Sequence, residues 1–287
     1  MNISRRKIAA LVAITGLVTG CYRYFNNEKI TPAPVQQEMV LCDFHAHPSD
    51  KQSTQTLRTM LGSPGLVGLA YRNGAPGVFT YDEAKKLLGK EQEYCEITPG
   101  HLAKYREGYI MRTQELTPNR HHILAIGCNR YLPEGSSVET MMKEIRQHQG
   151  IAILSHPFVV KGGLYARHPT TKEELRIRNF YALADEVEAH NATIINVIPG
   201  LSFKDSNADA SALATEYGFT GVAVSDCHRQ ASQAKRCGIY LPTKVIEAGI
   251  DAILEAIRNQ NFTRYGEYET GPYLSRKEWF AGFVIER

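Results

Sequence analysis

Short apolar runs alternate with amphipathic segments along most of the chain. Buried strands are predicted at residues 39–42, 65–70, 122–127, 151–154, 186–189 and 220–224. Helices are predicted at residues 81–88, 99–107, 138–149, 208–217 and 250–259, and one more begins at a Thr171 cap. Strands that alternate with helices predict an α/β fold with a mainly parallel sheet or barrel.

The first predicted strand runs into Asp43-Phe44-His45-Ala46-His47. Alternate residues of a strand share a face, so we expect Asp43, His45 and His47 to point the same way. Two imidazoles and a carboxylate at one strand end suit a divalent ion such as Zn²⁺, Mn²⁺ or Fe²⁺.

Three later strands end in comparable groups: Ser155-His156-Pro157, Glu186-Val187-Glu188 and Ser225-Asp226-Cys227-His228. In an α/β barrel the C-terminal strand ends meet at one rim, where the loops build the active site. The sequence therefore predicts a metal site there. Its expected ligands are His45, His47, His156, Asp226 and His228.

The first 38 residues are predicted to lie outside the folded domain. Residues 1–20 carry three basic residues and then a short apolar core, as signal peptides do, and end in a lipobox-like Val18-Thr19-Gly20 before Cys21. Cys21 is thus the predicted lipidation site, residues 21–38 a tether, and residues 39–287 the barrel domain. The expected location is the bacterial cell envelope, reached by the Sec route or, given Arg5-Arg6-Lys7, the twin-arginine route. An uncleaved signal anchor is the alternative.

Removal of residues 1–20 changes the charge balance of the protein. The chain has 33 Lys+Arg and 30 Asp+Glu, and the leader takes three basic residues and no acidic ones, which leaves 30 against 30. A neutral mature protein gives no electrostatic reason to bind nucleic acid. The expected partners are a small phosphorylated substrate and, through the lipid on Cys21, a membrane.

From about residue 40 to about residue 270 the chain resembles the polymerase and histidinol phosphatase (PHP) superfamily of metal-dependent phosphoesterases. The motif at 43–47, Ser155-His156-Pro157 and the final Ser225-Asp226-Cys227-His228 carry the resemblance, together with the strand at 186–191. The resemblance implies a distorted seven-stranded β/α (TIM-like) barrel that holds up to three metal ions and hydrolyses phosphate esters.

Two motifs of that superfamily differ here. Tyr71-Arg72-Asn73 stands where a Thr-Asp-His triplet is expected, and Gly127-Cys128-Asn129 stands where a metal-bridging Glu follows a Gly. The resemblance then implies one or two ions rather than three. Cys128 or Asn129 takes the place of the bridging ligand, although Cys128 is equally consistent with a buried thiol.

Other residues near strand ends are assigned supporting roles. Arg72, Arg130, Lys161 and Arg229 are candidate phosphate contacts, with plain surface charge as the alternative for each. Asp226, His228 and Arg72 are the candidate catalytic residues, whereas Asp43 and Glu188 are expected to orient ligands. Two other functions stay open: an amidohydrolase-like enzyme that cleaves C–N bonds, and a catalytically silent, membrane-tethered binding protein.

Overall fold

The computed structural model describes residues 38–47, 54–73, 79–162, 165–167, 169–192, 197–198, 201–202, 206–228 and 234–266. The predicted leader, the lipidation site Cys21 and the tether up to residue 37 lie outside these residues, as does Arg229. Within the described part, no helix combines the length and apolar character needed to cross a membrane.

A twelve-stranded mixed sheet forms a barrel-like core, in the order β13-β10-β7-β6-β5-β2-β1-β15-β16, with β3, β4 and β14 attached at the side. The strands are β1 (Met39–His47), β2 (Gly65–Arg72), β3 (Tyr94–Thr98), β4 (Leu102–Tyr105), β5 (Gly108–Leu116), β6 (His122–Ile126), β7 (Ile151–Ser155), β10 (Glu186–Asn191), β13 (Val222–Val224), β14 (Cys227–His228), β15 (Gly238–Pro242) and β16 (Thr263–Tyr265). Two small hairpins lie outside the sheet: β8 (Val160–Gly162) with β9 (Tyr165–Arg167), and β11 (Val197–Ile198) with β12 (Leu201–Ser202).

Along the order β13-β10-β7-β6-β5-β2-β1-β15-β16 the sheet is parallel except around β6 and β15, and the attached strands β3 and β4 pair antiparallel. β1, β2 and β5 run parallel, as do β7, β10 and β13. β6 is antiparallel to both of its neighbours, β5 and β7, and β15 is antiparallel to β1. The first residue of β6 therefore lies at the same rim as the last residues of β5 and β7.

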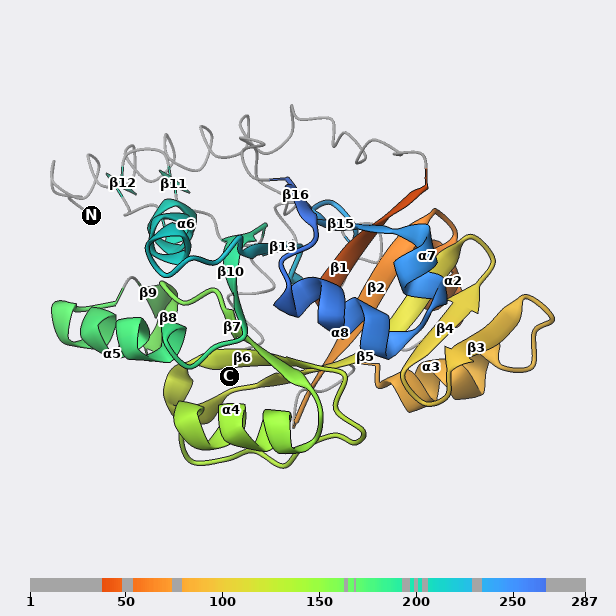
Figure 1. Cartoon of the computed structure of the whole chain (residues 1–287), viewed down its shortest axis with the longest axis horizontal. Coiled ribbons are helices and arrows are strands. Elements are labelled where there is room, and N and C mark those ends of the chain that lie inside the picture. Colours follow the sequence, from red (N-terminus) through yellow and green to blue (C-terminus); the bar gives the residue numbers. More distant parts are fainter. Residues whose placement is uncertain are drawn as a thin grey trace, which may run out of the picture.

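The helices cover the outside of the sheet (Figure 1). They are α2 (Thr54–Leu61), α3 (Tyr81–Leu88), α4 (Val138–Gln147), α5 (Thr171–Tyr181), α6 (Ser206–Glu216), α7 (Thr243–Glu247) and α8 (Ile250–Arg258), with a short 3-10 turn at Pro118–Arg120. Helices α4, α5 and α6 pack on the side of β6, β7 and β10, and α2 and α3 pack on the side of β2 and β5.

Helix α8 closes one end of the barrel. Its Leu254 and Ile257 pack with Phe44, Ile153 and Val224 from the inner faces of the strands. Each such fully buried side chain contributes about 1.5–3 kcal/mol. Gly127, just after β6, lies against this helix, because a Cβ on Gly127 would fall 2.6 Å from Leu254 Cδ1. The other rim is thus the one that carries the polar groups.

Strand β14 attaches the segment after β13 to the end of β1. After β13 the chain makes a short turn at Ser225 and Asp226, and β14 then pairs in parallel with the end of β1. In this register His47 lies opposite His228. The pairing carries Asp226 to the histidines of β1.

Most of the predicted elements are confirmed, including the α/β barrel class. The sheet has twelve strands rather than seven, because β3, β4, β14, β15 and β16 add to it. The helix predicted at residues 99–107 is wrong: β4 and the start of β5 form an antiparallel hairpin there, with Arg106 (φ 56°) in its turn. The cap of α5 is Thr170, whose backbone N–H donates to Glu173 Oε2 (2.8 Å).

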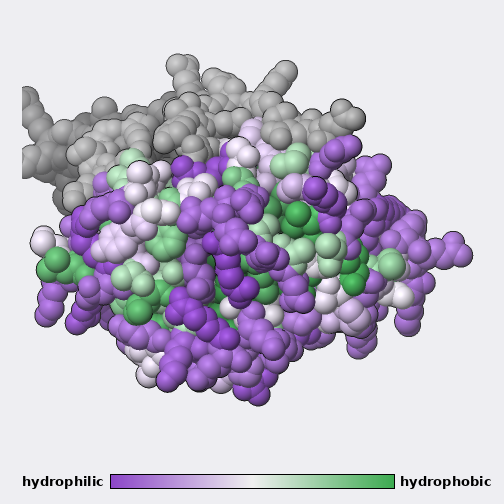
Figure 2. Space-filling view, in the orientation of Figure 1, coloured by the Kyte–Doolittle hydropathy of each residue, from purple (hydrophilic) through white to green (hydrophobic). Residues whose placement is uncertain are grey.

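Polar residues dominate the face in Figure 2, with hydrophobic residues in small patches between them. Large exposed hydrophobic side chains within the described residues are Leu175, Leu183 and Tyr217.

Candidate metal centre

An irregularity in β1 turns its two histidines into the barrel. The pairing of β1 with β2 shifts register between Asp43 and Ala46, where β1 contains one extra residue. Phe44 belongs to the inner core, but Ala46 packs in the outer cluster with Val67. The alternation is therefore reset, and His45 and His47 face inward.

Asp43 does not share the face of the two histidines, in contrast to the prediction. Its carboxylate accepts hydrogen bonds from Ser225 N (3.0 Å), Ser225 Oγ (2.5 Å) and Lys235 N (2.9 Å). Asp43 thus fastens β1 to the segments before β14 and β15. Burial raises its pKa to about 6, although Ser225 and Lys235 oppose that rise.

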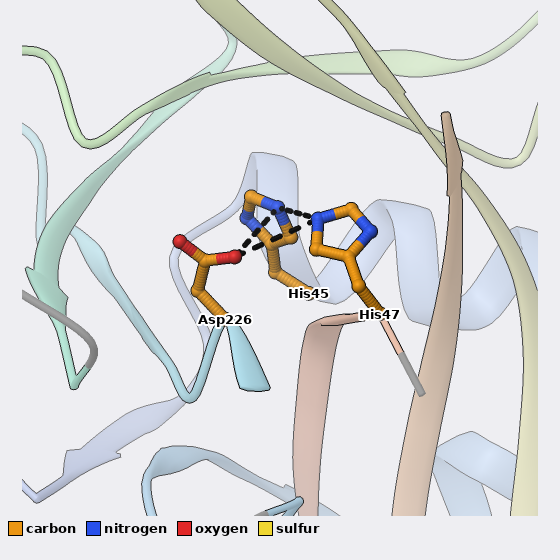
Figure 3. A group of neighbouring side chains, drawn as sticks. All are labelled: His45, His47 and Asp226. Carbon is orange, nitrogen blue, oxygen red and sulfur yellow. Dashed lines mark hydrogen bonds and ion pairs between the residues drawn. The ribbon is translucent and has the colours of Figure 1, made fainter. Parts of the chain in front are cut away.

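His45, His47 and Asp226 form the first group of possible metal ligands (Figure 3). His45 Nε2 and His47 Nε2 lie 2.9 Å apart, and Asp226 Oδ1 lies 3.5 Å and 3.6 Å from them. Ligand atoms of a tetrahedral zinc ion, at ordinary bond lengths, lie about 3.3 Å from one another. The spacing of this group therefore fits one ion.

Glu115, from the inner face of β5, lies beside this group. Its Oε1 lies 3.6 Å from His45 Nε2, and its Oε2 lies 3.2 Å from His47 Nε2. Its carboxylate is therefore close to both imidazoles of the first group. No role had been predicted for Glu115 from the sequence.

Glu115 also belongs to a second group, with His122 and His156. Glu115 Oε1 contacts His122 Nδ1 and lies 3.5 Å from His156 Nε2. The rings of His122 and His156 meet edge to face at 4.6 Å. The carboxylate of Glu115 thus contacts histidines of both groups, and His122 is a further candidate ligand that was not predicted from the sequence.

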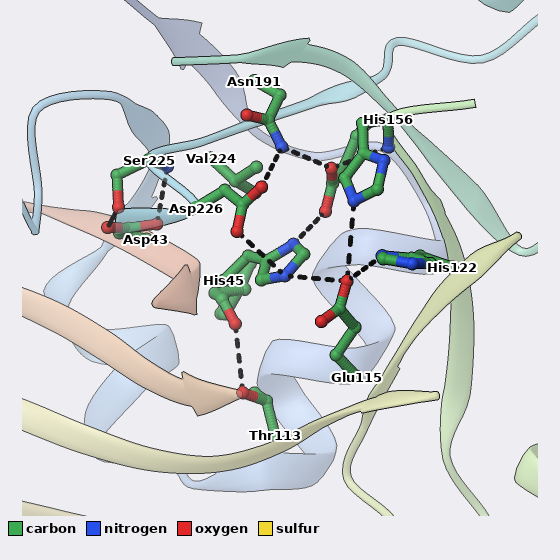
Figure 4. A network of polar contacts seen from close by, with 12 residues as sticks. Asp43, His45, Thr113, Glu115, His122, His156, Asn191, Val224, Ser225 and Asp226 are labelled. Atoms are coloured by element: carbon green, nitrogen blue, oxygen red, sulfur yellow. Dashed lines mark hydrogen bonds and ion pairs between the residues drawn. The ribbon is translucent and has the colours of Figure 1, made fainter. Parts of the chain in front are cut away.

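Glu188 orients the first ligand. His45 Nδ1 donates to Glu188 Oε1 (2.6 Å), which leaves Nε2 of the same ring facing the first group. Glu188 Oε2 accepts from the backbone N–H of His156 (2.9 Å). A histidine held in this way by a carboxylate is typical of metal sites. Figure 4 shows the network around His45.

The electrostatics of the site favour a bound cation. Burial alone would lower the pKa of His45, but the carboxylates of Asp226 and Glu188 raise it to about 10. Burial alone would raise the pKa of Glu115, but His122 and His47 hold it well below its usual value. Three carboxylates are buried together at this site, those of Glu115, Glu188 and Asp226. A divalent ion bound there would neutralise part of their negative charge.

Two of the ligand candidates occupy strained backbone conformations. His156 has φ of 26° and Asp226 has φ of 47°, in the left-handed region that residues with a side chain rarely adopt. Such strain concentrates at functional sites, where the surrounding structure enforces it.

The structure does not bring Cys128 or Asn129 to this site, and their assignment as ligands is corrected. The prediction placed them at the C-terminal end of a parallel strand, whereas β6 is antiparallel and ends beside α8. Cys128 is buried near Ile145 O, and burial raises its pKa to about 12. Asn129 Oδ1 contacts the ring of His148 (3.0 Å) at the surface.

The structure describes the side chains of two candidate phosphate contacts, Arg72 and Arg130. Arg72, at the end of β2, lies at the site: its Nε is 4.0 Å from Glu115 Oε2, and its side chain is 21% exposed. Arg130 follows β6 on the side of Asn129 and contacts His148, away from the two groups. Lys161 lies on β8 and His228 on β14, and the structure describes the side chain of neither.

No family model matches the sequence, and no curated protein matches it either. The fold, in contrast, matches solved structures. One is a two-domain protein from Bacteroides vulgatus ATCC 8482 that contains a predicted PHP-like metal-dependent phosphoesterase: the match has a TM-score of 0.55 and 13% identity, and covers 90% of this chain and 74% of that one.

Two more solved structures match at similar levels. PsfC from Pseudomonas syringae PB-5123 gives a TM-score of 0.52 and 13% identity over 86% of this chain and 98% of that chain. The lesion-specific endonuclease PfuEndoQ from Pyrococcus furiosus gives 0.52 and 15% over 79% of this chain and 57% of that one. The resemblance to the PHP superfamily is therefore confirmed at the level of the fold: this chain has the fold of the PHP-like metal-dependent phosphoesterases.

Proposed function

We propose that this protein is a metal-dependent phosphoesterase with two ions at the rim of its barrel. The observation that carries the proposal is the position of Glu115, whose carboxylate lies between the group of His45, His47 and Asp226 and the pair His122 and His156. A shared carboxylate between two sets of histidines is suited to a pair of divalent ions.

Each of the two ions would have its own set of ligands, and Glu115 would belong to both sets. His45, His47, Asp226 and Glu115 would hold the first ion, and Glu115, His122 and His156 the second. Such ions, when bound, lower the pKa of water and draw charge from a phosphoryl oxygen. Zn²⁺, Mn²⁺ and Fe²⁺ all accept imidazole and carboxylate ligands. The choice among them is one for measurement.

Arg72 is the proposed phosphate contact. It lies beside Glu115 at the open side of the site, and its guanidinium is partly exposed. A guanidinium stays charged and can give two parallel hydrogen bonds to a phosphate. Arg72 would supply positive charge at the position where the PHP resemblance implies a metal-binding group.

We assign proton transfer to the motif Ser225-Asp226-Cys227-His228. Asp226 lies within reach of both histidines of β1, and His228 pairs through its backbone with His47. We propose that His228 carries a proton to the leaving oxygen, since Asp226 is better placed as a ligand. Asp226 was predicted to be both a metal ligand and a catalytic residue, and we keep only its role as a ligand.

The proposal extends to the substrate and to location. The balanced charge of residues 21–287 supports a small phosphorylated substrate rather than nucleic acid. The sequence of residues 1–21 supports export and lipidation at Cys21, so that the barrel would act in the cell envelope. The silent-barrel alternative loses its main argument, because Glu115 supplies the bridging carboxylate that the motif at Gly127 lacks.

The test is phosphate release by the purified protein after reconstitution with Zn²⁺, Mn²⁺ or Fe²⁺. A panel of small phosphomonoesters should be hydrolysed, and the His45→Ala/His47→Ala double variant should be inactive and lack the first ion. Ammonia release from amides without phosphate release would favour the amidohydrolase alternative. Metal content without either activity would favour a binding protein.

A further inference from the structure

A buried carboxamide joins two carboxylates of the site. Asn191, the last residue of β10, donates from Nδ2 to Asp226 Oδ2 (3.0 Å) and to Glu188 Oε2 (3.2 Å). Its side chain is almost fully buried. In Figure 4, Asn191 lies next to Asp226, with dashed lines for these contacts. The sequence analysis gave this residue no role.

The contact requires an amide rather than a carboxylate. Two carboxylate oxygens converge on one nitrogen, and a group placed between them must offer two hydrogens and no lone pair. The –NH₂ of Asn does so, whereas an Asp in the same place would add a third set of acceptors. In a buried setting this like-charge contact is poorly screened.

Asn191 is itself held from outside the site. Its backbone N–H donates to Asn207 Oδ1 (3.1 Å), and Asn207 Nδ2 donates back to Asn191 O (3.0 Å). Asn207 belongs to α6, on the outer layer. The backbone of Asn191 is thus fixed to a helix, which sets the position from which its carboxamide reaches the two carboxylates.

Asn191 bonds to one oxygen of each carboxylate. Glu188 keeps two other donors, His45 Nδ1 and the backbone N–H of His156. For Asp226, the contact with Asn191 orients Oδ2, so that Oδ1 faces His45 and His47. Asp226 also sits in a left-handed backbone conformation, which a side-chain anchor helps to keep.

We propose that Asn191 is a positioning residue for the first ion: it holds Asp226 in the orientation that completes the group of His45 and His47, without touching the ion. The inference rests on the proposed two-ion site. It predicts that the first ion responds more strongly than the second, because the Asn191 bond to Asp226 is made to a candidate ligand of the first ion.

The experiment is a Co²⁺ titration of the purified full chain, followed by the visible absorption of the bound ion, with metal content measured in parallel. Wild type should take up two ions. In Asn191→Ala the Kd of one ion should rise about ten- to a hundredfold, the value of a hydrogen bond to a charged group, while the other ion stays unchanged. The isosteric Asn191→Asp should weaken the same ion at least as much at neutral pH.

Gln114→Ala is the matched control for a general loss of stability. Gln114 is also a buried carboxamide, and it exchanges two hydrogen bonds of 2.7 Å with the backbone of Leu132 on the outer side of β5. This variant should have a lower Tm and keep both ions with wild-type affinity.

The outcomes separate the two proposals. If wild type binds two ions and both Asn191 variants bind them equally well, the positioning role is wrong and the site stands. Equal weakening of both ions in Asn191→Ala and in Gln114→Ala would also overturn it, because the effect would then be one of stability. If wild type binds no ion, the proposed function itself fails. Should Asn191→Ala not fold, the isosteric Asp variant decides.

Discussion

Replacement of Glu115 by Gln should remove both ions at once. Its carboxylate lies 3.2 Å from His47 Nε2 in the first group and 3.5 Å from His156 Nε2 in the second. Gln keeps the shape of the side chain but loses its charge and turns an –NH₂ toward one of the groups. Because its carboxylate contacts histidines of both groups, this one substitution should act on both ions.

The size of the effect follows from the burial of Glu115. Its side chain is 2% exposed and faces several imidazoles, and removal of one partner from a buried pair costs about 3–5 kcal/mol. A bound ion would replace these imidazoles as the positive partner of the carboxylate. Loss of the carboxylate charge should then raise the Kd of each ion by roughly two to four powers of ten. At a free Zn²⁺ concentration a few times the wild-type Kd, the variant should hold well under one ion per chain.

Glu186→Gln is the matched control for this prediction. Glu186 is also a fully buried carboxyl group, but it accepts hydrogen bonds from Val187 N (2.9 Å) and Gly221 N (3.1 Å) and is absent from both groups. Metal content should be measured by mass spectrometry at fixed free Zn²⁺. Two ions in Glu186→Gln and almost none in Glu115→Gln are expected. A Glu115→Gln variant that keeps two ions would refute the idea of a shared ligand.

Three other predictions concern substrate, pH and location. Arg72→Ala should raise KM for a phosphomonoester about ten- to a hundredfold with metal content unchanged, whereas Arg130→Ala should leave KM as it is; equal effects would remove Arg72 from the site. Burial raises the pKa of the Glu186 carboxyl group to about 7, above its value in the unfolded chain. As the pH rises, this group therefore loses its proton in the unfolded chain before it does so in the folded protein. The free energy of unfolding should then fall by about 3 kcal/mol between about pH 4.5 and pH 7. Urea denaturation should show that Glu186→Gln removes this fall, and an unchanged pH profile would contradict the assignment. Metabolic labelling with a fatty acid should mark wild type and not Cys21→Ser, and equal labelling of both would exclude the lipobox.

The sequence indicates the rim where the site lies, because apolar runs that end in His, Asp or Glu are visible without any structure. His45, His47, His156 and Asp226 were all found in this way, and the structure places them together. Their strand ends meet because β1, β7 and β13 all run in one direction, which the alternation of strands and helices predicted.

The pattern of apolar residues did not reveal the direction of β6. An apolar strand has the same pattern in either direction, and only its hairpin-like pairing with β5 shows that His122, rather than Cys128, lies at the rim. β5 itself was missed, because the residues before it were assigned to a helix and its alternation of Tyr109, Met111, Thr113 and Glu115 was not recognised. That alternation is the signal that would have identified Glu115.

The face of Asp43 was missed for a different reason. Alternation along β1 predicts that Asp43 and His45 share a face, but one extra residue in the strand resets the pattern between Asp43 and Ala46. A bulge of this kind depends on how neighbouring strands pair, and no local pattern in the sequence marks it.

Anomalous X-ray diffraction from crystals grown with Zn²⁺ would locate the proposed ions. Two anomalous peaks are expected, one among His45, His47 and Asp226 and one between His122 and His156, with the carboxylate of Glu115 between them. The absence of a peak at this rim, or a peak at Cys128 instead, would contradict the proposed two-ion site.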